Sequence, residues 1–143
     1  MFVFSKGKPK TFNPIKEKCK YVGESKSART FRQNGDSLEE THLKNEVKDT
    51  KIKGNIWFYS TGANKSTKDK IAFKHPAIFP EQLANDHIVS WSNENDIIFD
   101  PFMGSGTTAK MAELNNRRWI GIEISEDYCE ITKQRLKNIK KTT

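Results

Sequence analysis

The chain has 143 residues, of which 34% are hydrophobic and 30% charged, and its formal net charge at pH 7 is +7. This composition allows one modest hydrophobic core with additional polar segments, and it excludes a membrane span and a signal peptide because no apolar run is long enough. The two cysteines, Cys19 and Cys129, are far apart, and the histidines lack metal-binding spacing, so neither a disulfide framework nor a metal site is expected. A reducing compartment suits this cysteine usage, and we expect a soluble, cytoplasmic protein.

The positive charge is concentrated in the first half of the chain. Residues 1–74 hold 17 Lys and Arg against 8 Asp and Glu, whereas residues 75–143 hold 8 against 10. Because lysine and arginine release counterions from phosphate backbones, the first half is predicted to contact a polyanion. The alternative is a solvated, lysine-rich surface, which charge alone does not distinguish.

The first 53 residues give weak local signals. Residues 2–4 are predicted to form a short strand, and residues 6–14, with two prolines and a glycine, to form extended or looped chain. Residues 17–53 are polar without a helical or strand period, so irregular structure is expected there. Within them, Gln-Asn-Gly-Asp-Ser at 33–37 is a strong turn signal.

An aromatic cluster follows at residues 56–59, Ile-Trp-Phe-Tyr, and predicts a short strand, with a loop over residues 60–68. Aromatic rings beside lysines are suited to stacking on nucleic acid bases. A local hydrophobic core is the alternative interpretation, and it is the favoured one.

Regular structure is predicted from residue 80 onward. Apolar residues at helical spacing, with a proline at the start, predict an amphipathic helix over 80–91. The chain then predicts a strand over 96–100, a helix over 108–114, a strand over 118–124 and a final helix capped by Ser125. The residues expected to be buried on that final helix are Tyr128, Ile131, Leu136 and Ile139. We expect a β-α-β-α unit with parallel strands and a right-handed crossover.

A glycine-containing corner joins the first of these strands to its helix. Gly104 and Gly106 lack a Cβ and let a ligand approach the backbone, where free N–H groups at the helix start face it. Glu123 follows roughly 20 residues later, where an acid can accept hydrogen bonds from both hydroxyls of a ribose. A nucleoside-containing ligand is therefore predicted, and a simple tight turn is the alternative for the glycines.

Two other nucleotide-binding motifs compete for this corner. The run from Gly104 to Ala109 fits the dinucleotide pattern G-x-G-x-x-A, so a nicotinamide or flavin site stays open. Pro101 argues against that site because the dinucleotide glycine turn normally follows its strand directly. A phosphate-binding P-loop is excluded because no Lys-Ser or Lys-Thr follows the second glycine.

The corner and its neighbours resemble the DNA amino-methyltransferases that methylate adenine N6 or cytosine N4, in the class whose catalytic motif precedes the cofactor motif. Residues 100–107, Asp-Pro-Phe-Met-Gly-Ser-Gly-Thr, resemble their S-adenosylmethionine loop, and residues 121–124, Gly-Ile-Glu-Ile, the strand whose acid holds the cofactor ribose. Residues 74–81 resemble the segment that packs over the methionine end of the cofactor in that family. Residues 2–9 resemble the strand and basic loop that lead into its target-recognition region. The resemblance implies an α/β, partial Rossmann-like, S-adenosylmethionine-dependent methyltransferase fold.

The resemblance also assigns roles to individual residues. The two glycines let the methionine part lie against the backbone, the helix start meets its carboxylate, and Glu123 holds the ribose. Phe102 and Ile124 form apolar walls, with ordinary core as the alternative, and for His75 the alternative is a turn residue before Pro76. The implied cofactor-binding residues are Asp100, Phe102, Met103, Gly104, Gly106, Thr107, Thr108, Glu123, Ile124 and His75.

Two regions follow from this resemblance. Residues 1–70 form a basic, loop-rich region resembling the target-recognition segment, and residues 71–143 form the S-adenosylmethionine-binding unit. DNA is the implied partner, and the candidate DNA-binding residues are Lys6, Lys8, Lys10, Lys65 and Lys68. Lysine contacts to phosphates position a protein without specifying sequence, so the recognition sequence is not predicted.

The family's catalytic motif, Asp/Asn/Ser-Pro-Pro followed by an aromatic residue, is absent, because no two of the five prolines are adjacent. The chain therefore resembles a C-terminal half without a catalytic residue. We do not expect it to turn over alone, since methyl transfer needs the target base extruded into a closed pocket. The exposed faces of half a sheet predict a complementary N-terminal half, a second copy of the chain, or partial disorder.

Three functions remain open at this point. A DNA methyltransferase polypeptide, active with a complementary half and with adenine N6 favoured over cytosine N4, ranks first. A noncatalytic DNA- or cofactor-binding remnant ranks second. A NAD-type dinucleotide-binding module ranks third.

Overall fold

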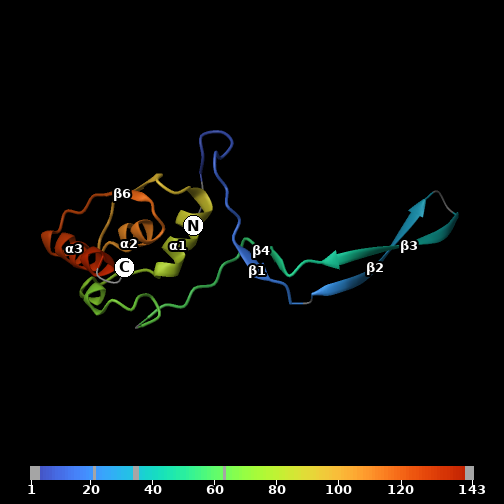
Figure 1. Ribbon diagram of the computed structural model, residues 1–143, viewed down its shortest axis with the longest axis horizontal. Coiled ribbons are helices and arrows are strands. Elements are labelled where there is room, and N and C mark those ends of the chain that lie inside the picture. The colour runs from blue at the N-terminus through green and yellow to red at the C-terminus, as the bar shows by residue number, and fades with distance from the viewer. Residues whose placement is uncertain (1–3, 21, 34–35, 63, 141–143) are drawn as a thin grey trace. The chain divides into compact units, whose positions relative to one another are not determined.

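The computed structural model describes residues 4–20, 22–33, 36–62 and 64–140 (Figure 1). The chain divides into two compact units. The smaller unit is Pro14–Asn55, and the larger unit combines Met1–Asn13 with Ile56–Thr143. The smaller unit is therefore an insertion between two segments that fold together.

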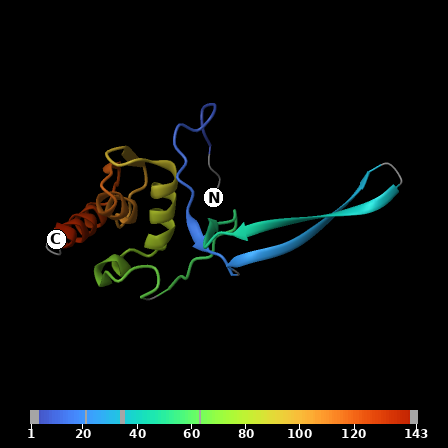
Figure 2. The same ribbon diagram turned by 45° about the vertical axis from the view of Figure 1, so that its right-hand side comes forward.

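The smaller unit consists of two antiparallel strand pairs. Strand β1 (Lys16–Lys18) pairs with β4 (Thr50–Ile52), and the longer β2 (Gly23–Gln33) pairs with β3 (Asp36–Val47). Figure 2 shows β2 and β3 as a long twisted ribbon. The short pair is extended at its two ends by backbone hydrogen bonds, one from the Cys19 N–H to the Asp49 carbonyl at 2.9 Å and one from the Lys53 N–H to the Ile15 carbonyl at 2.8 Å.

The prediction of irregular structure over residues 17–53 is wrong. The ribbon is held by its backbone ladder, which any side chain permits, so its polar residues can follow no detectable period. The predicted turn coincides with the β2–β3 junction, although Asn34 and Gly35 lie outside the described residues. An Asn-Gly pair between two extended runs is a hairpin signature, and this was the signal available in the sequence.

The larger unit contains the predicted β-α-β-α arrangement, which is confirmed. Strand β5 (Ile97–Asp100) leads through α2 (Thr107–Leu114) to β6 (Arg118–Gly121), and α3 (Glu126–Lys140) follows. The two strands are parallel, with a register that runs from Ile97 opposite Arg118 to Asp100 opposite Gly121. Ahead of them lie a short 3-10 helix, η1 (Lys70–Lys74), and α1 (Glu81–Trp91).

Local sequence explains where these helices begin and end. Pro80 precedes α1 and Glu81 lies in its first turn, as helix starts favour. Helix α2 ends at Leu114 with Asn115 as its C-cap, and the next residue, Asn116, takes a left-handed φ of 58°. Ser125 caps α3, because its Oγ accepts a hydrogen bond from the Tyr128 N–H at 3.4 Å.

The hydrophobic core lies on one face of the small sheet. Its buried residues are Ala84 and Ile88 from α1 and Met111 and Ala112 from α2, with Ile98 and Trp119 of the sheet packed against them. The alternating residues on the opposite face, which are Ile97, Phe99, Ile120 and Ile122, are 52 to 58% exposed. Apolar side chains on both faces are typical of strands from a sheet covered on both sides, and here only one face is covered.

The segment before the insertion packs against α1. Asn13 donates its N–H to the Ser90 carbonyl at 2.8 Å and its side-chain amide to the Val89 carbonyl at 3.1 Å, and so satisfies carbonyls at the helix C-terminus. Residues 4–13 contain no strand, and Phe2 and Val3, part of the strand predicted over 2–4, lie outside the described residues.

The aromatic cluster at 56–59 is extended chain, and the strand prediction there is wrong. The ring of Trp57 lies 5.1 Å from that of His87, and the Tyr59 hydroxyl donates to Asp86 at 2.9 Å. Alternate residues, Ile56 and Phe58, are exposed. The side chains of this segment contact helix α1, and its backbone pairs with no strand in the described part of the chain. Across the described ranges, no helix has the length and apolar character needed to cross a membrane.

Candidate functional site

The glycine corner is a tight loop between β5 and α2 that β6 holds in place. The Asp100 carboxylate accepts the Phe102 N–H at 3.0 Å, which turns the chain at the end of the strand. Beyond the end of the strand pair, the Ile122 N–H donates to the Asp100 carbonyl at 3.0 Å, and the Met103 N–H donates to the Ile122 carbonyl at 2.9 Å. The loop therefore begins as a continuation of the sheet.

Both glycines of the loop have left-handed backbone angles. The φ angles are +53° at Gly104 and +76° at Gly106, a region that residues with a Cβ rarely adopt. A Cβ on Gly106 would lie 2.5 Å from the Thr132 side chain of α3, and one on Gly104 would lie 3.1 Å from Nε2 of His75. The glycines are required both by their backbone angles and by close packing.

The Glu123 carboxylate is bound directly to this loop. One oxygen accepts the Gly104 N–H at 2.7 Å, and the other accepts the Ser125 N–H at 2.9 Å. The hydrogen bond from the Ser125 N–H is the largest influence that lowers the pKa of Glu123. The Gly104 and Ile124 N–H groups and the charge of His75 lower it further, and together they outweigh the opposing effect of burial. The carboxylate is thus ionised at neutral pH, and its remaining lone pairs can accept two further donors, such as neighbouring hydroxyls.

The apolar residues of the site divide into exposed and buried ones. Phe102 is 88% exposed and Ile124 is 98% exposed, so neither belongs to the core. Met103 is buried, and its Cε lies only 1.9 Å from where a Cβ on Gly121 would stand. The Met103 side chain therefore supports the loop from within, and the absence of a side chain at Gly121 makes room for it.

His75 lies at the same loop. Its ring is 4.2 Å from that of Tyr128 on α3, and its Nδ1 accepts the Ala77 N–H at 3.1 Å. With Nε2 directed at Gly104, the imidazole covers the loop from the side of η1. The structure thus brings His75, Gly104 and Glu123 together from three separate parts of the sequence.

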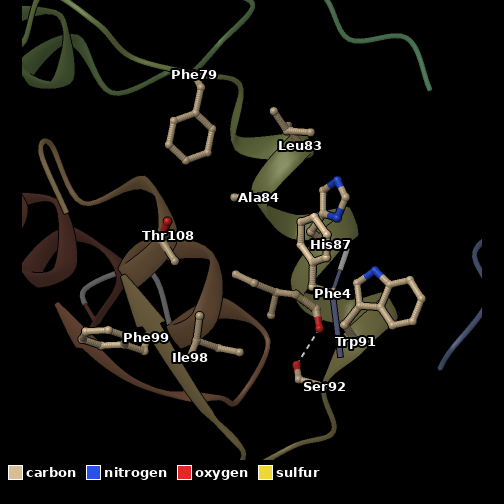
Figure 3. Close-up of a pocket in the computed structure, with 11 residues that line it drawn as sticks. Phe4, Phe79, Leu83, Ala84, His87, Trp91, Ser92, Ile98, Phe99 and Thr108 are labelled. Carbon is tan, nitrogen blue, oxygen red and sulfur yellow. Dashed lines mark hydrogen bonds between the residues drawn. The ribbon is translucent and has the colours of Figure 1, made fainter. Parts of the chain in front are cut away.

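The two threonines at the start of α2 have different surroundings. Thr107 is buried, and its Oγ1 accepts a hydrogen bond from Arg135 at 3.2 Å. Thr108 lines an apolar cleft of about 640 Å³ between α1 and β5 (Figure 3). Other residues that line this cleft are Phe4, Phe79, Leu83, Ala84, His87, Ile88, Trp91, Ser92, Ile98 and Phe99. Burial lowers the pKa of His87, so its ring is neutral at pH 7 and the cleft is uncharged.

A family comparison agrees with this geometry. The family model described as DNA methylase, of the N6/N4 type, matches residues 1–134 of the chain. The chain belongs to this DNA methylase family. The match covers both the corner and the segments before it.

Individual relatives of this chain are bacterial methyltransferases. The orphan methyltransferase M.BamHII of Bacillus amyloliquefaciens is 56% identical over 140 residues, which are 96% of this chain and 53% of that protein. The type II methyltransferase M2.LlaDCHI of Lactococcus lactis is 34% identical over 82% of this chain and 44% of that protein. The methylase chain thus spans about half the length of the curated relatives it matches.

Among solved structures, the cytosine-N4-specific PvuII DNA methyltransferase is similar to the chain. It shares 30% sequence identity, with a TM-score of 0.46, over 51% of this chain and 29% of that one.

The lysines predicted to bind DNA lie in two exposed loops of the larger unit. Lys6, Lys8 and Lys10 lie in the loop before Asn13, and Lys65 and Lys68 lie before η1, and all five are exposed. The hairpin residues 23–47 carry 4 Lys and Arg against 5 Asp and Glu, so the positive charge of the first half lies in the segments on either side of them. The role of these lysines stays a prediction, as does the functional division at residue 70.

Behind the loop lies a cluster of charges, half-buried around the fully buried Arg135, that the sequence interpretation missed. It consists of Arg135 and Lys110 with the carboxylates of Asp69 and Glu81. The signal was present, because Arg135 lies four residues after Ile131 and four before Ile139, on the buried side of α3. No group of three or more His, Cys, Asp or Glu within the described parts of the chain is arranged to hold a metal.

Proposed function

We propose that this methylase chain binds S-adenosylmethionine at the glycine loop and forms the cofactor-binding part of a DNA amino-methyltransferase. The observation that carries the proposal is the Glu123 carboxylate, bonded at 2.7 Å to the Gly104 N–H of a left-handed glycine loop. The ionised acid provides a site for the two hydroxyls of a nucleoside, and the adjoining loop provides a neighbouring site for the amino-acid end of the same ligand.

Each of the surrounding groups has a definite task in this proposal. The lone pairs of Glu123 accept the ribose hydroxyls, and exposed Phe102 and Ile124 enclose the adenine between apolar surfaces. The first N–H groups of α2, beginning at Thr107, face the carboxylate of the methionine part. When bound, S-adenosylmethionine supplies an activated methyl group, and the side chains of this chain fix its direction relative to the base.

The proposed acceptor is an exocyclic amino group of a DNA base, with adenine N6 favoured over cytosine N4. The family and its relatives support this substrate class. The exposed lysines flanking the hairpin are placed on the phosphate backbone in this proposal, in the cytoplasm where bacterial DNA lies. Replacing Lys6, Lys8 and Lys10 together by Gln should weaken DNA binding and flatten its salt dependence, by a log–log slope of about one for each phosphate that the variant no longer neutralises.

A complementary half is required to hold the base. The chain has no Pro-Pro motif, and its relatives are about twice its length. We assign the second half to the apolar cleft beside β5 and to the bare face formed by Ile97, Phe99 and Ile120. Within the described residues β5 pairs only with β6, so the outer edge of β5 is open to a further strand.

Calorimetry with S-adenosylhomocysteine tests the cofactor part of the proposal. The wild-type chain should bind it and should not bind NAD. Binding of NAD in its place would support a dinucleotide-binding module, and binding of neither would overturn the cofactor site.

Complementation tests the enzymatic part. The chain is mixed with the portion of M.BamHII that lies outside the region of similarity, and methyl transfer to DNA is measured. We expect transfer from the mixture and none from either component. Inactivity of a mixture that forms a stable complex would favour a noncatalytic remnant, and activity of the chain alone would point to a second copy as the partner.

A further inference from the structure

Arg135 is the most completely buried large side chain described, with 1% of its surface exposed, in the third turn of α3. Its Nε donates to the Asp69 carboxylate at 3.0 Å and its Nη2 to the Glu81 carboxylate at 2.7 Å. Lys110 of α2 donates to the same two carboxylates, at 2.7 and 2.8 Å. Two cations therefore share two anions, and the cluster is neutral overall.

The remaining donor of Arg135 points the other way, into the back of the glycine loop. Its Nη1 donates to the Ser105 carbonyl at 2.5 Å, with the Ser105 Oγ at 3.3 Å and the Thr107 Oγ1 at 3.2 Å. The ammonium group of Lys110, in contrast, is directed at the two carboxylates. Arg135 is thus the member of the cluster that connects the charges to the loop.

Stability alone is a weak explanation for this arrangement. Buried ion pairs rarely stabilise a fold more than well-packed apolar side chains of the same volume, because removing charges from water is costly. What a guanidinium supplies is a rigid planar fork with five donors, which no other side chain reproduces. Here that fork joins three separate segments, which are the chain before η1, the start of α1 and the glycine loop.

We propose that Arg135 is a positioning residue for the cofactor loop. It holds Ser105 and Thr107 from behind and so fixes the path of the loop into the start of α2, whose first N–H groups face the ligand in the proposed function. Thr132, one turn earlier on α3, adds a hydrogen bond to the Gly104 carbonyl at 3.1 Å. The inference rests on the proposed function, since it assigns Arg135 to the same site.

The test compares Arg135→Lys with Lys110→Gln in the full chain. The first variant keeps a cation for Asp69 and Glu81 but removes the fork that reaches the loop. The second removes a cation from the same carboxylates and leaves the loop contacts in place. Affinity for S-adenosylhomocysteine, thermal stability and hydrogen exchange of the loop amides are measured for both.

We expect Arg135→Lys to lower the affinity about tenfold, the effect of losing one charge-assisted hydrogen bond, and to speed amide exchange in residues 103–107. Lys110→Gln should lower the melting temperature with less than about a threefold change in affinity. Equal reductions of affinity in the two variants, or wild-type loop exchange in Arg135→Lys, would overturn the proposal.

A second variant serves if Arg135→Lys does not fold. Ser105→Ala combined with Thr107→Val keeps the ion pairs and the Nη1 bond to the Ser105 carbonyl but removes the two hydroxyl acceptors, so it should weaken binding and speed loop exchange less than Arg135→Lys does. Unchanged affinity in this variant would overturn the positioning role. Failure of the wild-type chain itself to bind would be a failure of the proposed function, and the loop exchange rates would still report on Arg135.

Discussion

The two sides of the glycine loop, the front near Glu123 and the back near Arg135, carry different chemical groups. The front presents the Glu123 carboxylate, held by the Gly104 N–H, and the exposed side chains of Phe102 and Ile124, so it is open to a ligand. The back is formed by the buried Arg135, whose guanidinium donates to the Ser105 carbonyl and the Thr107 hydroxyl and is paired with the carboxylates of Asp69 and Glu81. A loop whose glycines permit unusual backbone angles therefore relies on rigid support from distant parts of the chain.

The largest expected effect comes from filling the space between the loop and α3. Gly106→Ala places a Cβ 2.5 Å from Thr132 in a left-handed conformation, and the backbone angle and the clash together should cost about 2 to 4 kcal/mol of unfolding free energy. Chemical denaturation measures this cost, and we expect the variant to bind no S-adenosylhomocysteine.

Gly7→Ala is the matched control for this substitution. Gly7 has nearly the same φ, +77°, but a Cβ there meets nothing within 4 Å. It should cost about 1 to 2 kcal/mol, the backbone term alone. Equal costs at the two glycines would show that packing against α3 does not constrain the loop.

A smaller effect, confined to binding, is expected at the front. Glu123→Gln offers only one acceptor oxygen to the Gly104 and Ser125 N–H groups and removes the charge, so the affinity for S-adenosylhomocysteine should fall at least about tenfold. Glu126→Gln, at an exposed position in the first turn of α3, is the control. Calorimetry that finds both variants equal to wild type would remove Glu123 from the site.

The smallest effect is expected from a change of pH, which acts on the stability contributed by Asp69 in the charge cluster behind the loop. Burial raises the pKa of Asp69, but the hydrogen bonds and charges of Lys110 and Arg135 outweigh it and lower the pKa below its ordinary value of 3.8. The folded state therefore gains stability from ionised Asp69 at pH values above about 4, and it loses this gain as the pH falls through the lowered pKa.

Urea denaturation of wild type and Asp69→Asn at pH 7 and pH 3 checks this sign. The difference in unfolding free energy between the two proteins should be smaller at pH 3. A difference that is the same at both pH values would mean that Asp69 makes no ionised contact in the folded chain.

The sequence was sufficient for the front of the loop because the signals there are local. Glycines, a strand end and an acid at a set spacing predict the corner, and apolar periodicity with capping residues located α1, α2 and the start of α3 to within one residue. Such signals depend on residues close together in the chain.

The back of the loop could not be predicted because its partners are far apart. Arg135 bonds to Asp69 across 66 positions, and no periodic pattern relates the two. Composition does not distinguish an arginine on the surface from one in the core. Only its spacing from Ile131 on the helix indicates that Arg135 is buried. The polar hairpin was missed for a different reason, since its strands are held by backbone ladders that leave no hydrophobic pattern.

The pairing of β1 with β4 closes the smaller unit at its base. Its chain enters at Pro14 and leaves at Asn55 beside one another, with the Lys53 N–H bonded to the Ile15 carbonyl. An insertion with adjacent ends can be lengthened, shortened or exchanged without pulling on the segments that flank it. The hairpin can therefore vary in length or sequence while the segments on either side of it keep their fold.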